Sequence, residues 1–268
     1  MENNFVQLTV ENHVGIITLN RPEAGNSLDY QMAKQLMKAA VFCSENENVR
    51  AVVLTGSGNK FSVGGDLKSF ASHGDEVGAH LKIVTNYFHQ AVSLFARMNK
   101  PIIAAVNGVA AGGGMSLACA CDLVYAAEEA KFVTAYNKIA LTPDGSGSYF
   151  LPRLVGMRRA LELLYTNRPL AAKEAKEWGL VNDVLPSEKL KPFALDLATK
   201  LANGPKNSYG ATKKLLLHSL QETLESQMGM ESLMIAERAS SSEGKEGITA
   251  FLEKREADYV KNNTEVLK

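Results

Sequence analysis

Residues 101–122 read PIIAAVNGVAAGGGMSLACACD and place three consecutive glycines, Gly112 to Gly114, between two apolar segments. The first segment, residues 101–108, begins with proline, ends with glycine and has the apolar content of a buried strand. The glycines then open a segment that otherwise has the composition of a buried helix. Glycine inside a helix costs about 1 kcal/mol relative to alanine, so three in a row indicate either tight packing or the close approach of another molecule.

The segments on both sides of this stretch alternate between strand and helix patterns. Residues 5–10 and 14–19 alternate in polarity around a polar turn and predict an antiparallel hairpin. Leu28 to Cys43 place apolar side chains on one stripe and predict an amphipathic helix. Further strands are predicted at 50–56 and 121–128, and a helical region at 76–98. This alternation is typical of an α/β fold with mostly parallel strands.

From about Arg158 the pattern changes, and the remaining chain is mainly helical. Glycine and proline separate the helical segments, of which the longest runs from Ser208 to Arg238. The sequence therefore predicts an α/β core over residues 1–190 and a helical C-terminal region over residues 191–268.

The composition, with 46% hydrophobic and 22% charged residues, is that of an ordinary globular protein. The 29 basic and 29 acidic residues balance, which argues against nucleic acid or an anionic membrane as the main partner. Three cysteines are too few for a disulfide framework, and no apolar run approaches the roughly 20 residues of a membrane helix. Neither end of the sequence resembles a targeting signal, so we expect a cytoplasmic protein.

Several catalytic motifs are absent. The runs GSGNKF and GSGSYF lack the third glycine of a dinucleotide-binding loop, and GxxxxGK, HExxH and GxSxG do not occur. The five histidines are scattered along the chain, which argues against a metal site. The sequence therefore predicts neither a bound metal nor a cofactor.

Two glycine-rich loops each follow a predicted buried strand. FSVGGDLKSF, residues 61–70, follows the strand at 50–56, and AAGGGMSL, residues 110–117, follows the strand at 101–108. Ligands of parallel sheets bind beyond the carboxyl ends of the strands, where helix N-termini present free N–H donors. Two such loops can aim two backbone N–H groups at one substrate oxygen and form an oxyanion hole. Tight helix–strand packing is the alternative, and it explains either loop taken alone.

Six segments spread over the chain follow the order found in one enzyme family. They are NRPEAGNSLD (20–29), FSVGGDL (61–67), KPIIAAVNGVAAGGG (100–114), CDLVYAAEEAKF (121–132), LPRLVGMRRALELL (151–164) and EGITAFLEKR (246–255). Together they resemble the crotonase, or enoyl-CoA hydratase/isomerase, family over nearly the whole chain. The resemblance implies a crotonase-like spiral of ββα units with a helical trimerisation region, in a homotrimer or a dimer of trimers. The apolar stripe of residues 211–224, which a monomer would leave partly exposed, agrees with an oligomer.

The same resemblance implies an acyl-CoA thioester as substrate, with coenzyme A entering as part of it. It assigns the oxyanion donors to the N–H groups of Gly65 and Gly113, which hold the thioester oxygen as an enolate forms. It also implies that Asp66 orients the first loop, and that Phe251 and Lys254 reach coenzyme A, often from a neighbouring subunit. A solvated helix face is the alternative for Lys254. The other residues that it places at the substrate are Ala24 and Leu67, beside the nucleotide and pantetheine, with Gly64, Gly112 and Ser116.

The chain departs from the hydratases of this family at two positions. Those enzymes carry two glutamates, which together activate water and protonate the α-carbon. Here the two positions are Ser116 and Tyr136. Because neither side chain is a carboxylate, the sequence predicts an enzyme without standard hydratase activity.

Asp144, in TPDGSGSYFLPR, is the remaining candidate acid. An aspartate before glycine is by itself typical of a turn. Isomerases of the family, however, have an acid here that carries a proton between two carbons. The segment is also similar to that of the epoxide isomerases of phenylacetate degradation. We therefore predict an acyl-CoA isomerase that shifts a double bond or isomerises a ring, with Asp144 as its acid and base.

The 4-chlorobenzoyl-CoA dehalogenases of the family give an alternative interpretation. In them the acid attacks an aromatic carbon directly, His89 matches the hydrolytic histidine, and Tyr136 matches a tryptophan that hydrogen-bonds the acid. Those enzymes lack the proline that precedes Asp144 and have phenylalanine at the position of Gly65, and His89 is also explained as an ordinary helix residue. A third interpretation is a catalytically silent acyl-CoA binder, which the missing glutamates allow.

Overall fold

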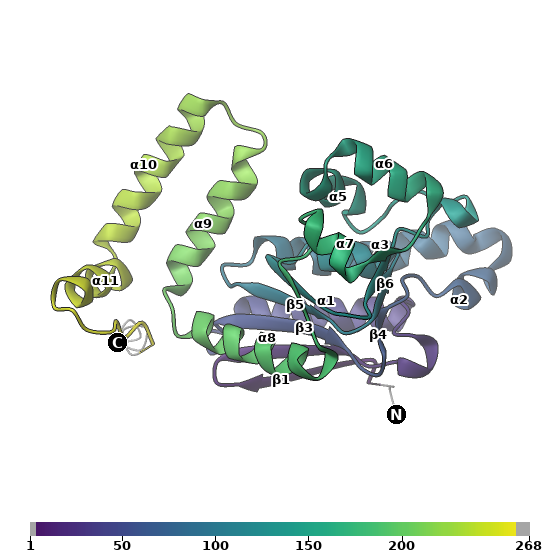
Figure 1. Ribbon diagram of the computed structural model, residues 1–268, viewed down its shortest axis with the longest axis horizontal. Helices are drawn as coiled ribbons and strands as arrows, with labels where there is room; N and C mark the ends of the chain where they lie inside the picture. The colour runs from purple at the N-terminus through teal and green to yellow at the C-terminus, as the bar shows by residue number, and fades with distance from the viewer. Residues whose placement is uncertain (1–3, 261–268) are drawn as a thin grey trace.

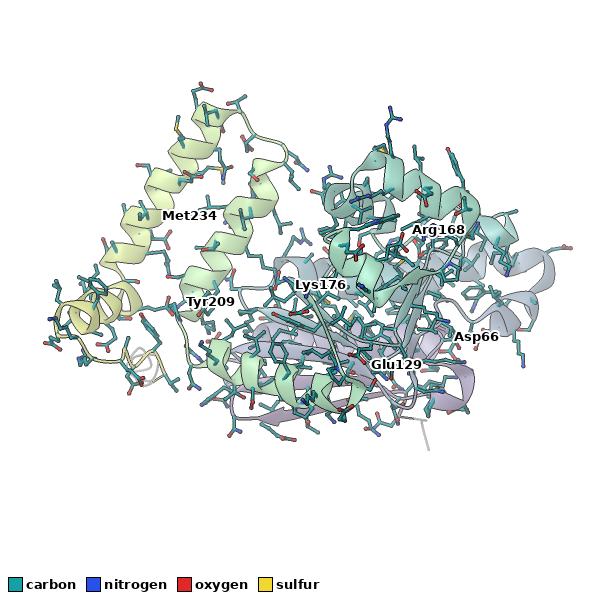
Figure 2. All side chains as sticks on the ribbon, viewed as in Figure 1. Asp66, Glu129, Arg168, Lys176, Tyr209 and Met234 are labelled. Carbon is teal, nitrogen blue, oxygen red and sulfur yellow. The ribbon has the colours of Figure 1, made fainter. Side chains whose placement is uncertain are left out.

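The structure, a computed structural model, describes residues 4–260, and two β-sheets form the centre of its core (Figure 1; the side chains are added in Figure 2). Residues 1–3 and 261–268, the outer ends of the two predicted regions, lie outside the described residues. The larger sheet contains, in spatial order, β1 (Val6–Glu11), β2 (Val14–Leu19), β3 (Ala51–Gly56), β5 (Ile102–Val106), β7 (Leu123–Ala127) and β10 (Asp183–Leu185). The smaller sheet contains β4 (Lys60–Ser62), β6 (Val109–Ala111), β8 (Lys131–Val133) and β9 (Leu170–Ala171).

One short repeat builds both sheets. β3 is followed along the chain by β4, β5 by β6, and β7 by β8, so each long strand of the larger sheet leads into a short strand of the smaller one. A helical segment follows each pair of strands. β2, β3, β5, β7 and β10 pair in parallel, while β1 and β2 form the predicted antiparallel hairpin. The predicted α/β spiral of ββα units is therefore confirmed.

The two helices predicted in the first hundred residues are present. α1 (Tyr30–Glu45) begins at Asp29, whose side chain accepts a hydrogen bond from the Met32 N–H, and α3 (Val77–Arg97) is the longer of the two. No helix within the described range has both the length and the apolar character that crossing a bilayer requires. The other helices of the core are α2 (Leu67–Ala71), α4 (Gly113–Cys119), α5 (Gly147–Val155), α6 (Met157–Thr166), α7 (Ala172–Glu177) and α8 (Ser187–Ala202), with short 3-10 turns at Pro22–Ala24, Gly74–Glu76 and Asn137–Ile139.

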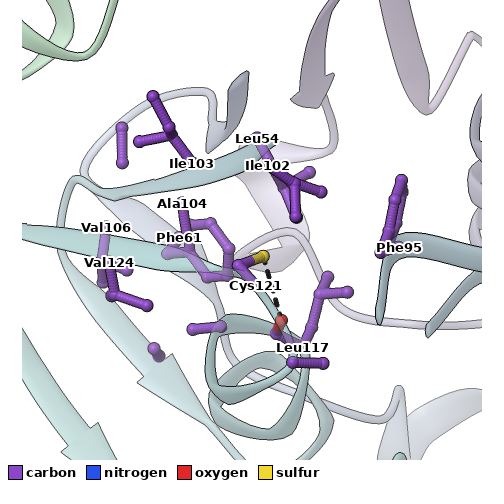
Figure 3. Close-up of a cluster of buried hydrophobic side chains, with 14 of the residues drawn as sticks. Leu54, Phe61, Phe95, Ile102, Ile103, Ala104, Val106, Leu117, Cys121 and Val124 are labelled. Atoms are coloured by element: carbon purple, nitrogen blue, oxygen red, sulfur yellow. Dashed lines mark hydrogen bonds between the residues drawn. The ribbon is translucent and has the colours of Figure 1, made fainter. Parts of the chain in front are cut away.

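Apolar side chains from β3, β4, β5, β7 and α4 meet in the core (Figure 3). Phe61, Ile103 and Leu117 are fully buried there. The Cys121 thiol donates to the Leu117 carbonyl oxygen at 3.4 Å, and burial raises the pKa of that thiol far above its ordinary value. All three cysteines of the chain are free and buried, which agrees with a packing role.

α8 closes one face of the larger sheet. Its buried side chains, Leu190, Ala194, Ala198 and Ala202, pack toward β2, β3, β5 and β7. The predicted border at residue 190 falls inside this helix, and the chain leaves the core after Ala202. The sequence pattern gave no sign of this, because an amphipathic helix has the same periodicity whether it covers a sheet or belongs to a separate bundle.

An arm of three helices, α9 (Lys206–Ser219), α10 (Leu224–Ser240) and α11 (Ser242–Leu252), extends away from the core (Figure 1). The helical stretch from Ser208 to Arg238 is thus two helices, with the break before Thr223, whose hydroxyl caps α10. Lys213 joins α9 to the core through Asp122 at 2.8 Å. Glu243 of α11 accepts hydrogen bonds from two N–H groups in the first turn of α9. The last helix of the arm therefore caps the N-terminus of the first.

Candidate active site

A cavity of about 540 Å³ lies between the two glycine loops. Its walls come from those loops, from α3 and from residues 135–144, which connect β8 to α5. Most lining side chains are apolar or aromatic and few are polar, which is typical of a small-molecule site. The predicted site residues at this cavity are Gly65, Leu67, Gly112, Gly113, Tyr136 and Asp144.

The first glycine loop is held by a single parallel bridge between Leu28 and Gly65. The Leu28 N–H donates to the Gly64 carbonyl oxygen at 2.7 Å, and the Asp66 N–H donates to the Leu28 carbonyl oxygen at 3.0 Å. In a parallel bridge of this kind the N–H of the middle residue points away from the partner strand. Within residues 4–260 no protein group accepts a hydrogen bond from the Gly65 N–H, which leaves it free for a ligand.

The three glycines of the second loop have three different reasons to be glycine. Gly112 has φ +49°, which side chains with a Cβ rarely adopt. At Gly113, the first residue of α4, an added Cβ would lie 2.9 Å from the Leu28 Cδ1. The Gly113 N–H has no acceptor among the described residues. Gly114 backs onto β4, where an added Cβ would lie 2.7 Å from the Ser62 Cβ. Both interpretations of the sequence therefore apply here, since close packing and a free N–H occur on adjacent residues.

The two loops lie against each other. A Cβ placed on Gly64 would lie 3.1 Å from the Gly113 nitrogen and 2.7 Å from the Ala111 carbonyl oxygen. Standard bond lengths then place the Gly65 and Gly113 nitrogens within about 7 Å of each other. One oxygen atom can accept two hydrogen bonds of about 2.9 Å only where the two nitrogens lie within about 6 Å of each other, and this bound allows such a separation.

Asp144 also lines the cavity and contacts His89 of α3. The His89 Nε2 is 2.6 Å from the Asp144 Oδ1, and the two side chains are 53% and 34% exposed. The pair is therefore open to solvent on one side. Within residues 4–260, no cluster of three or more His, Cys, Asp or Glu side chains is arranged to hold a metal ion.

Ser116 and Tyr136, at the two positions where hydratases of the family carry glutamate, are bonded to each other. Their hydroxyl oxygens are 3.1 Å apart, and the Tyr136 hydroxyl donates to the main-chain carbonyl oxygen of Asp144 at 3.1 Å. Burial raises the pKa of Tyr136 to about 12, so its hydroxyl stays protonated and remains a donor. Tyr136 thus holds the backbone of Asp144. The resemblance to the dehalogenases, in which a tryptophan at this position hydrogen-bonds the acid, had predicted a bond to the acid itself.

The other predicted residues lie at different distances from the cavity. Asp66 caps α2, accepting hydrogen bonds from the N–H groups of Lys68 and Ser69. Ser116 lies behind Tyr136, while Ala24 and Gly64 are outside the lining of the cavity. Phe251, 84% exposed, and Lys254 lie at and just beyond the end of α11, on the opposite side of the molecule from α2 (Figure 1). The structure therefore does not bring Phe251 and Lys254 to the cavity of their own chain.

Sequence reasoning missed Phe88, which packs against both the second glycine loop and the segment that contains Asp144. Its ring is buried and lies against both Gly113 and Gly145. Gly145 has φ +58°, and an added Cβ would collide with this ring. Phe88 and His89 are adjacent in α3, so one turn of this helix holds both the backbone after Asp144 and its carboxylate.

Comparison with known proteins agrees with this geometry. Residues 9–262 match the model of the enoyl-CoA hydratase/isomerase family. The chain is 36% identical over 258 residues to the 1,2-epoxyphenylacetyl-CoA isomerase of Escherichia coli, covering 95% of this chain and 98% of the relative. It is 37% identical over 227 residues to the 4-chlorobenzoyl coenzyme A dehalogenase-2 of an Arthrobacter species, covering 84% and 82%.

Among solved structures, an enoyl-CoA hydratase from Polaromonas sp. JS666 superposes with a TM-score of 0.90 at 34% identity. The superposition covers 94% of this chain and 98% of that one. Sequence, fold and the two glycine loops agree, and the chain belongs to the crotonase, or enoyl-CoA hydratase/isomerase, family.

Proposed function

We propose that this protein is an acyl-CoA isomerase that moves a proton between two carbons of the acyl group. The thioester oxygen accepts hydrogen bonds from the N–H groups of Gly65 and Gly113. Asp144 removes a proton from one carbon, the resulting enolate is stabilised by the two N–H donors, and Asp144 returns the proton to another carbon. Each oxyanion donor is worth about 3 kcal/mol in such reactions. Coenzyme A takes part only as the carrier of the acyl group.

One observation carries the proposal: among the described residues that line one apolar cavity are a single carboxylate, Asp144, and two N–H groups without an acceptor, those of Gly65 and Gly113. The places of the two hydratase glutamates are occupied by the bonded pair Ser116 and Tyr136. One carboxylate can carry a proton between carbons, whereas hydration also needs a second group to hold and activate water. The likeness to a relative named as an isomerase supports the same conclusion.

A second candidate is hydrolytic dehalogenation of an aryl-CoA, and the 2.6 Å contact between His89 and Asp144 favours it. In that reaction the Asp144 carboxylate attacks the halogen-bearing ring carbon and halide leaves. His89 then takes a proton from a water molecule that hydrolyses the aspartyl ester. The likeness to a relative named as a dehalogenase supports this candidate. Glycine at position 65 and proline at position 143 count against it.

Isotope exchange in heavy water distinguishes these reactions. With 3-hexenoyl-CoA we expect conversion to 2-hexenoyl-CoA. The product is expected to carry deuterium to the extent that the proton on the partly exposed Asp144 exchanges with solvent before it is returned, and mass spectrometry measures this deuterium. We expect no efficient addition of water to crotonyl-CoA. Efficient hydration of crotonyl-CoA would overturn the proposal. Chloride release from 4-chlorobenzoyl-CoA would establish the second candidate, and a His89→Gln variant would then accumulate a covalent adduct on Asp144. Binding of these esters without exchange or halide release would identify a silent binder.

We further propose that the arm assembles the protein into a homotrimer, or a dimer of trimers. Large apolar side chains on the arm are exposed in the single chain, which water-exposed helices of a monomer rarely show. They include Leu216 of α9, Leu220 directly after it, Leu224, Leu233 and Ile235 of α10, and Ile248 and Phe251 of α11. Light scattering at micromolar concentration is expected to give three or six times the chain mass, and a monomer mass would contradict the proposal.

A further inference from the structure

Arg21, which follows β2, lies beneath the first glycine loop. Its Nη1 is 2.7 Å from the Asp66 Oδ2 and 3.1 Å from the Asp29 Oδ2. The same Nη1 donates to the Ser27 hydroxyl oxygen at 3.3 Å. The side chain is 19% exposed and the two carboxylates less so. Screening by water is therefore weak at this contact, and the interactions are stronger than those of a surface ion pair.

In each of the two carboxylates, one oxygen accepts hydrogen bonds at the N-terminus of a helix and the other oxygen contacts Arg21. The Asp29 Oδ1 accepts from the Met32 N–H at 2.8 Å, at the start of α1. The Asp66 Oδ1 accepts from the N–H groups of Lys68 and Ser69, at the start of α2. Burial raises the pKa of Asp66, but the bonds from Ser69 and Arg21 outweigh it, so the pKa lies below its ordinary value. Asp66 is consequently ionised at neutral pH and pairs with Arg21 as an anion.

Asp29 and Asp66 directly follow Leu28 and Gly65, the two residues of the isolated bridge. We infer that Arg21 is a positioning residue that fixes the direction of the Gly65 N–H by tying together the residues after both members of that bridge. The inference rests on the proposed role of this N–H as an oxyanion donor. Without Arg21, backbone hydrogen bonds would still keep the loop in register, from the Leu28 N–H to Gly64, the Asp66 N–H to Leu28 and the Val63 N–H to Gly25. Asp29 and Asp66 would lose the partner that they share.

Two further contacts support the loop, and the first is the second glycine loop, which lies against Gly64. The ring of Phe70 lies against Gly65, where an added Cβ would be 2.5 Å from the ring edge. This contact limits movement of Gly65 in one direction. The hydrogen bond from the Leu28 N–H to the Gly64 carbonyl oxygen orients the peptide group that carries the Gly65 N–H, so the direction of this N–H depends on where Leu28 is held. A displacement of about 1 Å at a reacting group lowers rate by about a hundredfold, so a loosened donor is expected to affect turnover strongly.

The test measures how strongly the site polarises a thioester carbonyl, using benzoyl-CoA labelled with carbon-13 at that carbonyl. Benzoyl-CoA has no exchangeable α-proton, so its infrared C=O stretch reports the oxyanion donors alone. We expect wild-type protein to lower the stretch, and Arg21→Gln to lose at least about half of that shift. Turnover of 3-hexenoyl-CoA is expected to fall about ten- to a hundredfold while the benzoyl-CoA dissociation constant changes less than about threefold.

Two further variants make the result specific. Asp66→Asn keeps an oxygen for the α2 cap but turns an amide toward Arg21, so it is expected to reproduce the Arg21→Gln loss with a smaller effect on folding. Arg168→Gln breaks contacts of similar length, to Glu162 and Glu174, outside the cavity and is expected to keep the full shift. A full shift and normal turnover in Arg21→Gln or Asp66→Asn would overturn the inference alone. An unshifted carbonyl in the wild-type complex would overturn the proposed oxyanion site and this inference together.

Discussion

Replacing Asp144 with asparagine is expected to lower isomerisation at least about a hundredfold while coenzyme A ester binding survives. Asparagine has the same shape and still contacts His89, which is 2.6 Å from the carboxylate in the structure. It cannot accept the substrate proton, however, so the step through the enolate loses its base. Steady-state rates with 3-hexenoyl-CoA and calorimetric titration with benzoyl-CoA measure the two quantities separately.

Asp183→Asn is the matched control, because Asp183 pairs with Lys176 at the surface and does not line the cavity. It is expected to retain wild-type turnover. If Asp144→Asn also retains isomerase activity, Asp144 is not the acid and base of the reaction. A loss of ester binding in parallel with turnover would instead assign Asp144 to substrate binding.

Replacing Gly114 with alanine is expected to destabilise the folded protein by about 2–3 kcal/mol, the effect of overpacking a tight contact. An added Cβ would lie 2.7 Å from the Ser62 Cβ and 3.0 Å from the Ser62 carbonyl carbon. Because the nearest atoms include backbone, α4 has to move away from β4. Thermal unfolding at one fixed protein concentration is expected to show a midpoint about 4–8 °C lower.

Gly229→Ala in α10 is the comparison, because nothing lies within 4 Å of the position of its added Cβ. In a helix interior without such contacts, alanine is expected to stabilise by up to about 1 kcal/mol. Equal midpoints for Gly114→Ala and wild type would show that this glycine is not required for packing.

The five long strands of the core and the helices α1 and α3 could be predicted from local patterns. Glycine or proline bounds β3 and β5, and each of the two helices carries an apolar stripe. The break before Thr223 could not be predicted. Leu220 and Leu224 continue the apolar pattern across it, and no glycine or proline interrupts the run. The signal present was Thr223 itself, a common N-cap residue.

In the candidate site, too, some residues could be identified from the sequence and others could not. The glycine loops were found from short segments, because each loop consists of residues adjacent in sequence. Asp144 was singled out only through the family resemblance, since its own segment indicates a turn. Phe88 and Arg21 were not found, because their roles come from contacts with Gly145 and Asp66, which are distant along the chain. An arginine after a strand and a phenylalanine on an amphipathic helix have no local feature that separates them from ordinary structural residues.

The hydrogen bond between Ser116 and Tyr136 also constrains how this enzyme can evolve. Glutamate at position 116 alone would be a buried acid beside a phenol whose proton is already given to the Asp144 carbonyl oxygen. Glutamate at position 136 alone would remove the hydroxyl that holds the backbone of Asp144. Each single step toward a two-carboxylate site therefore weakens the present site before the second carboxylate is in place. Lineages with this pair are expected to diversify in the acyl group they accept more readily than in the reaction they catalyse.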